Sequence, residues 1–141
     1  MRRVLFGFVL GVSSSVAASP LVNTLDQSVL RVAPSGKASV TEWARGEKAW
    51  LGLLTLDAGA AVPEHHDLTE EYIHVLEGTG TLTMDGVDHQ LAPGTSVVMP
   101  AGATVRYQNG PQKLVAVQVF AGPESADKYA GWPVSGPPTP R

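Results

Sequence analysis

One short segment of the chain concentrates side chains that could bind a metal ion or move a proton. His65, Asp67 and Glu71 place one imidazole and two carboxyl groups close together in the sequence. If residues 65–67 are extended, His65 and Asp67 share one face and His66 points to the other. Such an oxygen-rich set suits Mn(II), Mg(II) or Zn(II) better than metals that prefer soft ligands. Without a metal, two carboxyl groups close together in a dry cavity repel, so one keeps its proton and is suited to proton transfer.

The remaining histidines have ordinary structural interpretations. His74 lies three residues after Glu71, so an unbroken strand places it on the opposite face. His89 falls in the arm of an expected hairpin and has no acidic cluster near it in the sequence. We therefore expect both side chains to lie outside the site.

Three further side chains are weaker candidates for contact with a ligand. Tyr107 alternates onto the same face as Val105. Gln118 joins them if the even-numbered residues of the last strand face inward. Trp50 could line the barrel or form an interface, although an aromatic residue in a β-rich protein is more often part of the core.

The elements that must position these residues are predicted to be strands. Short runs rich in Val, Leu, Thr and aromatic residues alternate with Gly, Pro, Asp and Asn, which is typical of a sandwich or barrel. The pair Asp85-Gly86 lies between two such runs and predicts a tight type I′ hairpin. The expected strands are 29–32, 39–43, 49–56, 72–76, 80–84, 87–91, 96–99, 104–107 and 113–120.

Composition excludes several classes of function. The chain has 141 residues, which suits one ordinary domain, and its formal charge of −3 argues against nucleic acid as a partner. Cysteine is absent, so disulfides, thiolate catalysis and cysteine zinc sites are excluded. Beyond the N-terminal segment no apolar stretch is long enough for a membrane span.

The two ends of the chain differ from the region between them. Residues 1–18 read as a signal peptide, with Arg2 and Arg3 before an apolar stretch at 4–12 and cleavage expected after Ala18. We therefore expect a secreted or periplasmic protein. Residues 122–141 are rich in Pro and Gly, and this tail is not expected to join a sheet because proline donates no ladder hydrogen bond. The expected domain is 19–121.

Two spaced frames of residues carry a family resemblance. The first frame has the spacing G-x5-H-x-H-x3-4-E-x6-G, and its positions are occupied by Gly59, His65, Asp67, Glu71 and Gly78. The second frame has the spacing G-x5-P-x-G-x2-H-x3-N, and its positions are occupied by Gly94, Pro100, Gly102, Val105 and Asn109. In this order, with 15 residues between them, the frames resemble the two signature motifs of the cupin superfamily. The resemblance covers about residues 48–121, with the core motifs at 59–109.

The resemblance implies a small antiparallel jelly-roll β-barrel, the cupin-like double-stranded β-helix, with a cavity between its sheets. In cupins the two histidines and the glutamate of the first motif, with the histidine of the second, bind one divalent metal. Here His65 and Glu71 match, Asp67 stands at the second histidine and Val105 stands at the fourth ligand, where it offers no donor. The resemblance therefore leaves two alternatives: a divalent metal (Mn, Zn, Fe or Ni) held by His65, Asp67 and Glu71, or no metal.

Three functions follow from this resemblance. The first is an exported small cupin that binds a small molecule in its barrel through His65, Asp67 and Glu71, with or without a metal. The second is an enzyme of isomerase, lyase or other proton-transfer type, in which His65 and Glu71 act as catalytic acid–base groups. The third is a structural dimer with a degenerate site. Cupins are often homodimers, so we expect a homodimer under all three.

Overall fold

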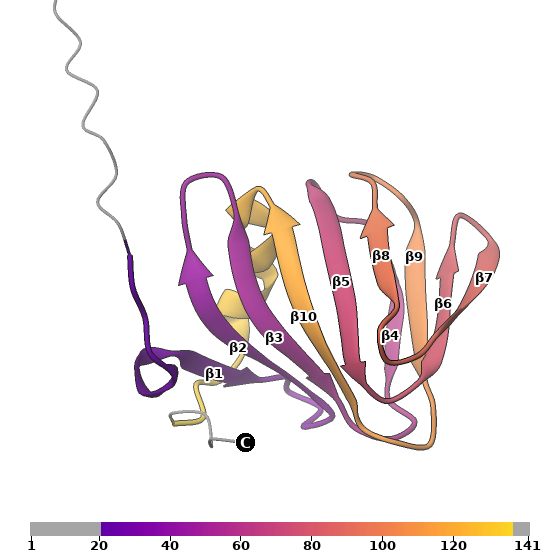
Figure 1. Cartoon of the computed structure of the whole chain (residues 1–141), viewed down its shortest axis with the longest axis horizontal. Coiled ribbons are helices and arrows are strands. Elements are labelled where there is room, and N and C mark those ends of the chain that lie inside the picture. Colours follow the sequence, from indigo (N-terminus) through magenta and orange to yellow (C-terminus); the bar gives the residue numbers. More distant parts are fainter. Residues whose placement is uncertain (1–20, 137–141) are drawn as a thin grey trace, which may run out of the picture.

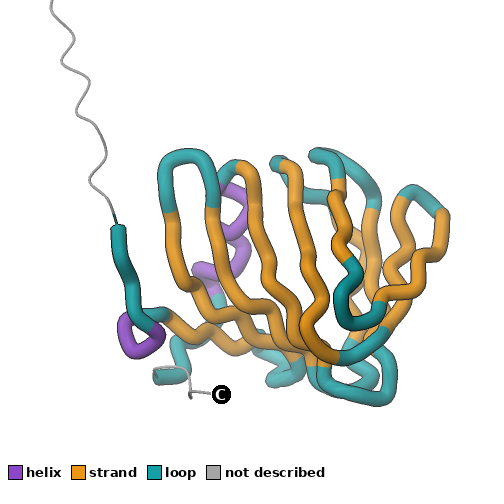
Figure 2. The backbone as a smooth tube through the Cα atoms, in the orientation of Figure 1, coloured by secondary structure: helices purple, strands orange, loops and turns teal. Residues whose placement is uncertain are grey.

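The computed structural model describes residues 21–136 and consists mainly of two antiparallel β-sheets (Figures 1 and 2). The larger sheet has six strands in the order β1-β2-β3-β10-β5-β8, and the smaller has four in the order β4-β9-β6-β7. The strands are β1 (Val29–Val32), β2 (Ala38–Arg45), β3 (Trp50–Leu56), β4 (Ala61–His65), β5 (Glu70–Glu77), β6 (Gly80–Met84), β7 (Val87–Leu91), β8 (Ser96–Met99), β9 (Val105–Asn109) and β10 (Leu114–Ala121). Two 3₁₀ helices complete the described chain, η1 (Leu25–Gln27) and η2 (Pro123–Gly131). The predicted all-β jelly-roll β-barrel is confirmed.

The β6–β7 hairpin forms as its turn residues predict. Asp85 has φ 48° and Gly86 has φ 82°, the positive values that both central residues of a type I′ turn require. Met84 and Val87 pair directly on either side of this turn. The hairpin closes one end of the smaller sheet.

Nine of the ten described strands were expected, and β1, β6, β7 and β8 have the predicted bounds. The strand that the sequence did not predict is β4. Its sequence contains Pro63 and Glu64, which interrupt the hydrophobic alternation. β4 pairs with β9 across a register shift between Val62 and His65. This shift accommodates a segment that lacks a regular strand pattern.

The prediction that the C-terminal tail stays out of the sheet is wrong for part of it. Val134 forms an antiparallel bridge with Arg31 in β1. The carbonyl oxygen of Pro133 accepts a hydrogen bond from the Val32 amide at 3.0 Å. Proline lacks an amide donor, but its carbonyl still accepts, so the tail extends the edge of the larger sheet.

Two apolar clusters lie inside the fold. The first joins both sheets and includes Leu56 and Val75 of the larger sheet with Leu82 and Val105 of the smaller one. The second gathers aromatic and small side chains under η2, namely Val40, Trp50, Phe120, Ala126 and Tyr129. Leu54 packs against both clusters. Because Trp50, Leu54 and Leu56 alternate onto one face of β3, η2 covers the inner face of the larger sheet beside the first cluster.

In Figure 1 η2 lies behind β2, β3 and β10. This helix runs from Pro123 to Gly131. Tyr129 packs against Trp50 with ring centroids 5.7 Å apart, and Trp132 meets Tyr129 edge-on at 4.9 Å. These contacts fix η2 against the barrel.

The predicted signal peptide at 1–18 lies outside the described residues. Within residues 21–136 no helix is long and apolar enough to span a membrane.

Candidate functional site

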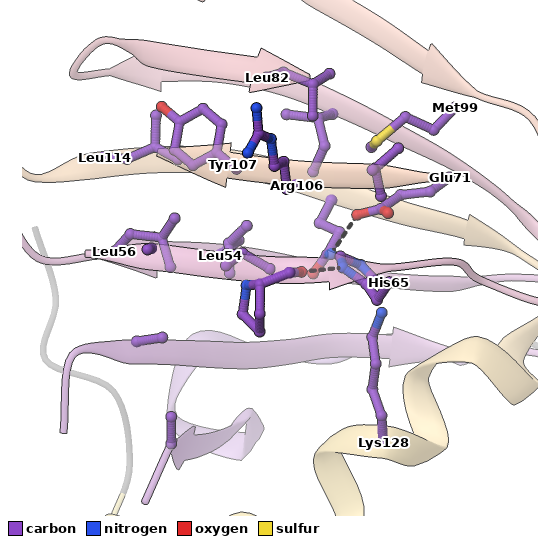
Figure 3. A pocket seen from close by; sticks show the side chains of 18 of the residues that line it. Leu54, Leu56, His65, Glu71, Leu82, Met99, Arg106, Tyr107, Leu114 and Lys128 are labelled. Atoms are coloured by element: carbon purple, nitrogen blue, oxygen red, sulfur yellow. Dashed lines mark hydrogen bonds between the residues drawn. The ribbon is translucent and has the colours of Figure 1, made fainter. Parts of the chain in front are cut away.

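A cavity of about 260 Å³ lies between the two sheets, and Figure 3 shows many of its lining side chains. Most of its walls are aliphatic, and both sheets contribute, including Leu54, Leu56, Ile73, Leu82, Val97 and Leu114. Polar side chains also line the cavity, from the loop after β1 and from β4, β5, β9, β10 and η2, namely Ser35, His65, Glu71, Arg106, Tyr107, Gln118, Lys128 and Tyr129. A cavity with apolar walls and a few gathered polar groups is the usual form of a small-molecule site.

One part of this polar group is a buried hydrogen-bonded chain. Gln118 donates from Nε2 to Oε1 of Glu71 at 2.6 Å, and the Tyr129 hydroxyl donates to Oε1 of Gln118 at 3.1 Å. All three side chains are buried. Burial raises the pKa of Glu71 to about 7, although the hydrogen bond from Gln118 opposes this rise. Glu71 can therefore exchange a proton near neutral pH inside the cavity.

The other part is an ion-paired cluster around Asp67. Nζ of Lys128 donates to Oδ1 of Asp67 at 2.7 Å, and Nε2 of His65 lies 3.6 Å from Oδ2. Burial raises the pKa of Asp67, but the contacts with His65 and Lys128 outweigh it and lower this pKa to about 2. The contact with Asp67 raises the pKa of His65, against the lowering effect of burial. Asp67 is therefore ionised at neutral pH and stabilises a positive charge on its neighbours.

These residues do not fit the metal ion that the cupin motifs imply. Among residues 21–136 no group of three or more His, Asp or Glu side chains is arranged to hold a metal ion. The Lys128 ammonium already contacts Oδ1 of Asp67, and the Gln118 amide already contacts Oε1 of Glu71. Val105, at the fourth ligand position, is paired with His65 across β9 and β4 and has no donor atom. A divalent ion at this place would lie beside an ammonium group and repel it.

Four of the predicted site residues line the cavity: His65, Glu71, Tyr107 and Gln118. Asp67 is not among the lining residues, and it acts on the cavity through His65 and Lys128. Trp50 lies in the cluster under η2 and does not line the cavity. Its indole nitrogen donates to Oε2 of Glu42 at 2.7 Å.

The expected exclusions agree with the structure. His66, His74 and His89 are all exposed, and His74 contacts Ser96 on the outer side of the larger sheet. Sequence reasoning missed Lys128 as a member of the site. This lysine falls in the Pro/Gly-rich tail, where no motif or spacing distinguishes it from a solvent-exposed charge.

Comparison with known proteins supports the resemblance to cupins that the two motifs indicate. Residues 52–120 match the family model of the cupin domain. The chain is 31% identical over 75 residues to an uncharacterised protein of Streptomyces coelicolor. The aligned region covers 53% of this chain and 71% of that protein. The chain belongs to the cupin family.

Solved structures share the fold. An RmlC-like cupin from Shewanella frigidimarina has a TM-score of 0.66 at 18% identity, over 74% of this chain and 92% of its own. The polyketide cyclase RemF from Streptomyces resistomycificus has a TM-score of 0.62 at 17% identity, over 72% of this chain and 79% of its own. At these identities the likeness establishes the fold, and function has to be argued from the site.

Proposed function

We propose that this cupin binds a small molecule in the cavity between its sheets and does so without a metal ion. The observation that carries the proposal is the cavity of about 260 Å³, with aliphatic walls and a gathered set of polar groups. Apolar walls favour binding by removing ligand surface from water, and the polar groups set the orientation of the ligand.

The contacts within the polar group support the metal-free form. Asp67 has an ammonium partner in Lys128, and Glu71 has an amide partner in Gln118. His65 directs Nδ1 to the carbonyl oxygen of Pro63 at 2.9 Å. These contacts hold the side chains in place, although Oδ2 of Asp67 is buried without a hydrogen-bond partner.

A pair of matched variants tests cavity binding. Val97 lines the cavity from β8, whereas its neighbour Val98 is exposed on the outer face. A panel of small metabolites is screened by thermal shift against the wild type, Val97→Phe and Val98→Phe. Compounds that raise the melting temperature of the wild type should lose this effect in Val97→Phe, whose larger side chain occupies part of the cavity, and keep it in Val98→Phe. Equal stabilisation of both variants would place the ligand elsewhere.

Proton-transfer catalysis is a second candidate, favoured by Glu71. This carboxyl group is buried and faces the cavity, and its pKa of about 7 suits a group that both takes and gives a proton at neutral pH. For a compound found in the screen, exchange of its carbon-bound hydrogens with deuterium oxide would report such transfer. Glu71→Gln should abolish the exchange while leaving binding measurable, and Glu47→Gln, at an exposed carboxylate, should leave both intact. Exchange that persists in Glu71→Gln would contradict the assignment.

We also propose that the protein is exported and that it forms a homodimer. Export rests on the signal-peptide pattern at 1–18, and N-terminal sequencing of the protein from its native host tests it. An intact Met1 there would overturn the export proposal. Light scattering on the purified protein tests the dimer, and the mass of a monomer would overturn it.

A further inference from the structure

Lys128 is held beside the cavity by its neighbours in η2. Tyr129 packs against Trp50 and Phe120 with ring centroids 5.7 and 6.3 Å away. At the start of the helix the hydroxyl of Ser125 accepts a hydrogen bond from the Thr69 amide at 3.1 Å and contacts the Thr69 hydroxyl at 2.6 Å. Because both ends of this helical stretch are buried and bonded, the intervening lysine has a defined starting position and direction.

The ammonium group of Lys128 reaches the polar end of the cavity. Its Nζ donates to Asp67 at 2.7 Å and lies 4.8 Å from the centroid of the Phe120 ring. Figure 3 shows the side chain pointing from η2 towards His65. An ammonium group has three N–H donors, and the contact with Asp67 uses one of them. Since Lys128 also lines the cavity, the remaining donors are available to a molecule inside it.

We propose that Lys128 anchors the ligand and that this ligand is a small monocarboxylate whose apolar body fills the cavity. The inference rests on the proposed cavity-binding function and adds the class of ligand. Lys128 brings an ammonium group to the polar end of the cavity, and its acidic partner, Asp67, does not line the cavity. The carboxyl group that does line it, Glu71, already accepts from Gln118. A ligand carboxylate would accept a charge-assisted hydrogen bond from the remaining N–H donors of Lys128.

The size of the cavity limits the body of the ligand. A volume of about 260 Å³ has room for roughly eight water molecules at about 30 Å³ each. A six-carbon chain with one polar head group is of this size. Hexanoate, hexan-1-ol and hexylamine share that chain and carry an anionic, a neutral and a cationic head group, so they separate the contribution of charge from that of the apolar body.

The experiment measures dissociation constants of the three probes by isothermal titration calorimetry on the full chain. The wild type is compared with Lys128→Met, which keeps an apolar stem, with Lys128→Arg, and with Lys113→Met at an exposed lysine outside the cavity. Hexanoate should bind the wild type most tightly and hexylamine least. Lys128→Met should weaken hexanoate about ten- to hundredfold and change hexan-1-ol little, because one charged hydrogen bond is lost. Lys128→Arg should restore part of the affinity, and Lys113→Met should match the wild type.

A second variant keeps the test decisive if Lys128→Met does not fold. Lys128→Met leaves Asp67 without its ammonium partner, so Lys128→Met/Asp67→Asn removes both charges together. Equal hexanoate affinity in this folded double variant and in Lys113→Met would overturn the anchoring role of Lys128. Hexan-1-ol binding as tightly as hexanoate, with both lost in Val97→Phe, would overturn the carboxylate class and leave the cavity function standing. Failure of all three probes to bind the wild type would overturn both.

Discussion

Replacing Glu71 with glutamine should abolish a loss of stability that the wild type suffers as the pH rises through neutrality. Burial raises the pKa of Glu71 from 4.5 to about 7, even though Gln118 donates a hydrogen bond to it. Between these values the folded state binds more protons than the unfolded chain, so the free energy of unfolding falls with rising pH. The rise in pKa corresponds to about 3 kcal/mol, at about 1.4 kcal/mol per pH unit. Glutamine is neutral throughout and still offers an oxygen to Gln118.

Urea unfolding followed by tryptophan fluorescence measures this difference. Near pH 4.5 Glu71→Gln and the wild type should have similar free energies of unfolding, and by about pH 8 the variant should be more stable by about 3 kcal/mol. Asp67 and His65 titrate in both proteins, so their contributions largely cancel in the difference. Glu47→Gln, at an exposed position, should run parallel to the wild type. A Glu71→Gln curve that also runs parallel would refute the reasoning.

Other substitutions probe the Asp67 cluster, the turn at Gly78 and the metal-ligand positions. Asp67→Asn should be less stable than the wild type above pH 3.8, and the difference should vanish as the pH falls towards 2. Burial raises the pKa of Asp67, but His65 and Lys128 outweigh it and lower the pKa to about 2, so a urea series in acid checks this loss. Gly78→Ala should lower the free energy of unfolding by more than about 1 kcal/mol, because φ is +83° there and an added Cβ would lie 2.4 Å from a backbone oxygen. An unchanged urea midpoint would contradict this account. Lys128→Ala combined with Val105→His should increase the zinc content measured by plasma mass spectrometry, because a competing cation is removed and a donor is added opposite His65. Zinc content equal to that of the wild type would show that other features exclude the ion.

The sequence predicted most of the fold because its signals are local. Alternation of apolar residues and the Asp85-Gly86 turn specify β6 and β7 to the residue. β4 was not predicted because Pro63 and Glu64 break the alternation of apolar residues. This strand is stabilised by pairing with β9, which is distant in the sequence. The pairing of the tail with β1 was not predicted either. A proline carbonyl can accept a hydrogen bond from a distant strand, and the local composition does not reveal this.

The candidate site could be predicted only in part. His65 and Glu71 were found through their motif spacing, and Tyr107 and Gln118 through alternation along their strands. Lys128 could not be found this way, because its partner Asp67 lies 61 residues earlier and no periodic pattern links the two.

The departures from the cupin metal pattern and the position of Lys128 form one electrostatic arrangement. Val105 removes a donor opposite His65, and η2 brings an ammonium group to Asp67, the residue that replaces the second motif histidine. Asp67 without a cation would be a nearly buried unpaired carboxylate, and Lys128 supplies that cation from a position 4.8 Å from the centroid of the Phe120 ring. Together they replace a multivalent ion, which requires acceptors around it, with a monovalent donor that requires an acceptor from the ligand. The same scaffold is thereby suited to a different head group, and the residues that determine it lie in the tail, in the loop that follows β4 and at the start of β9.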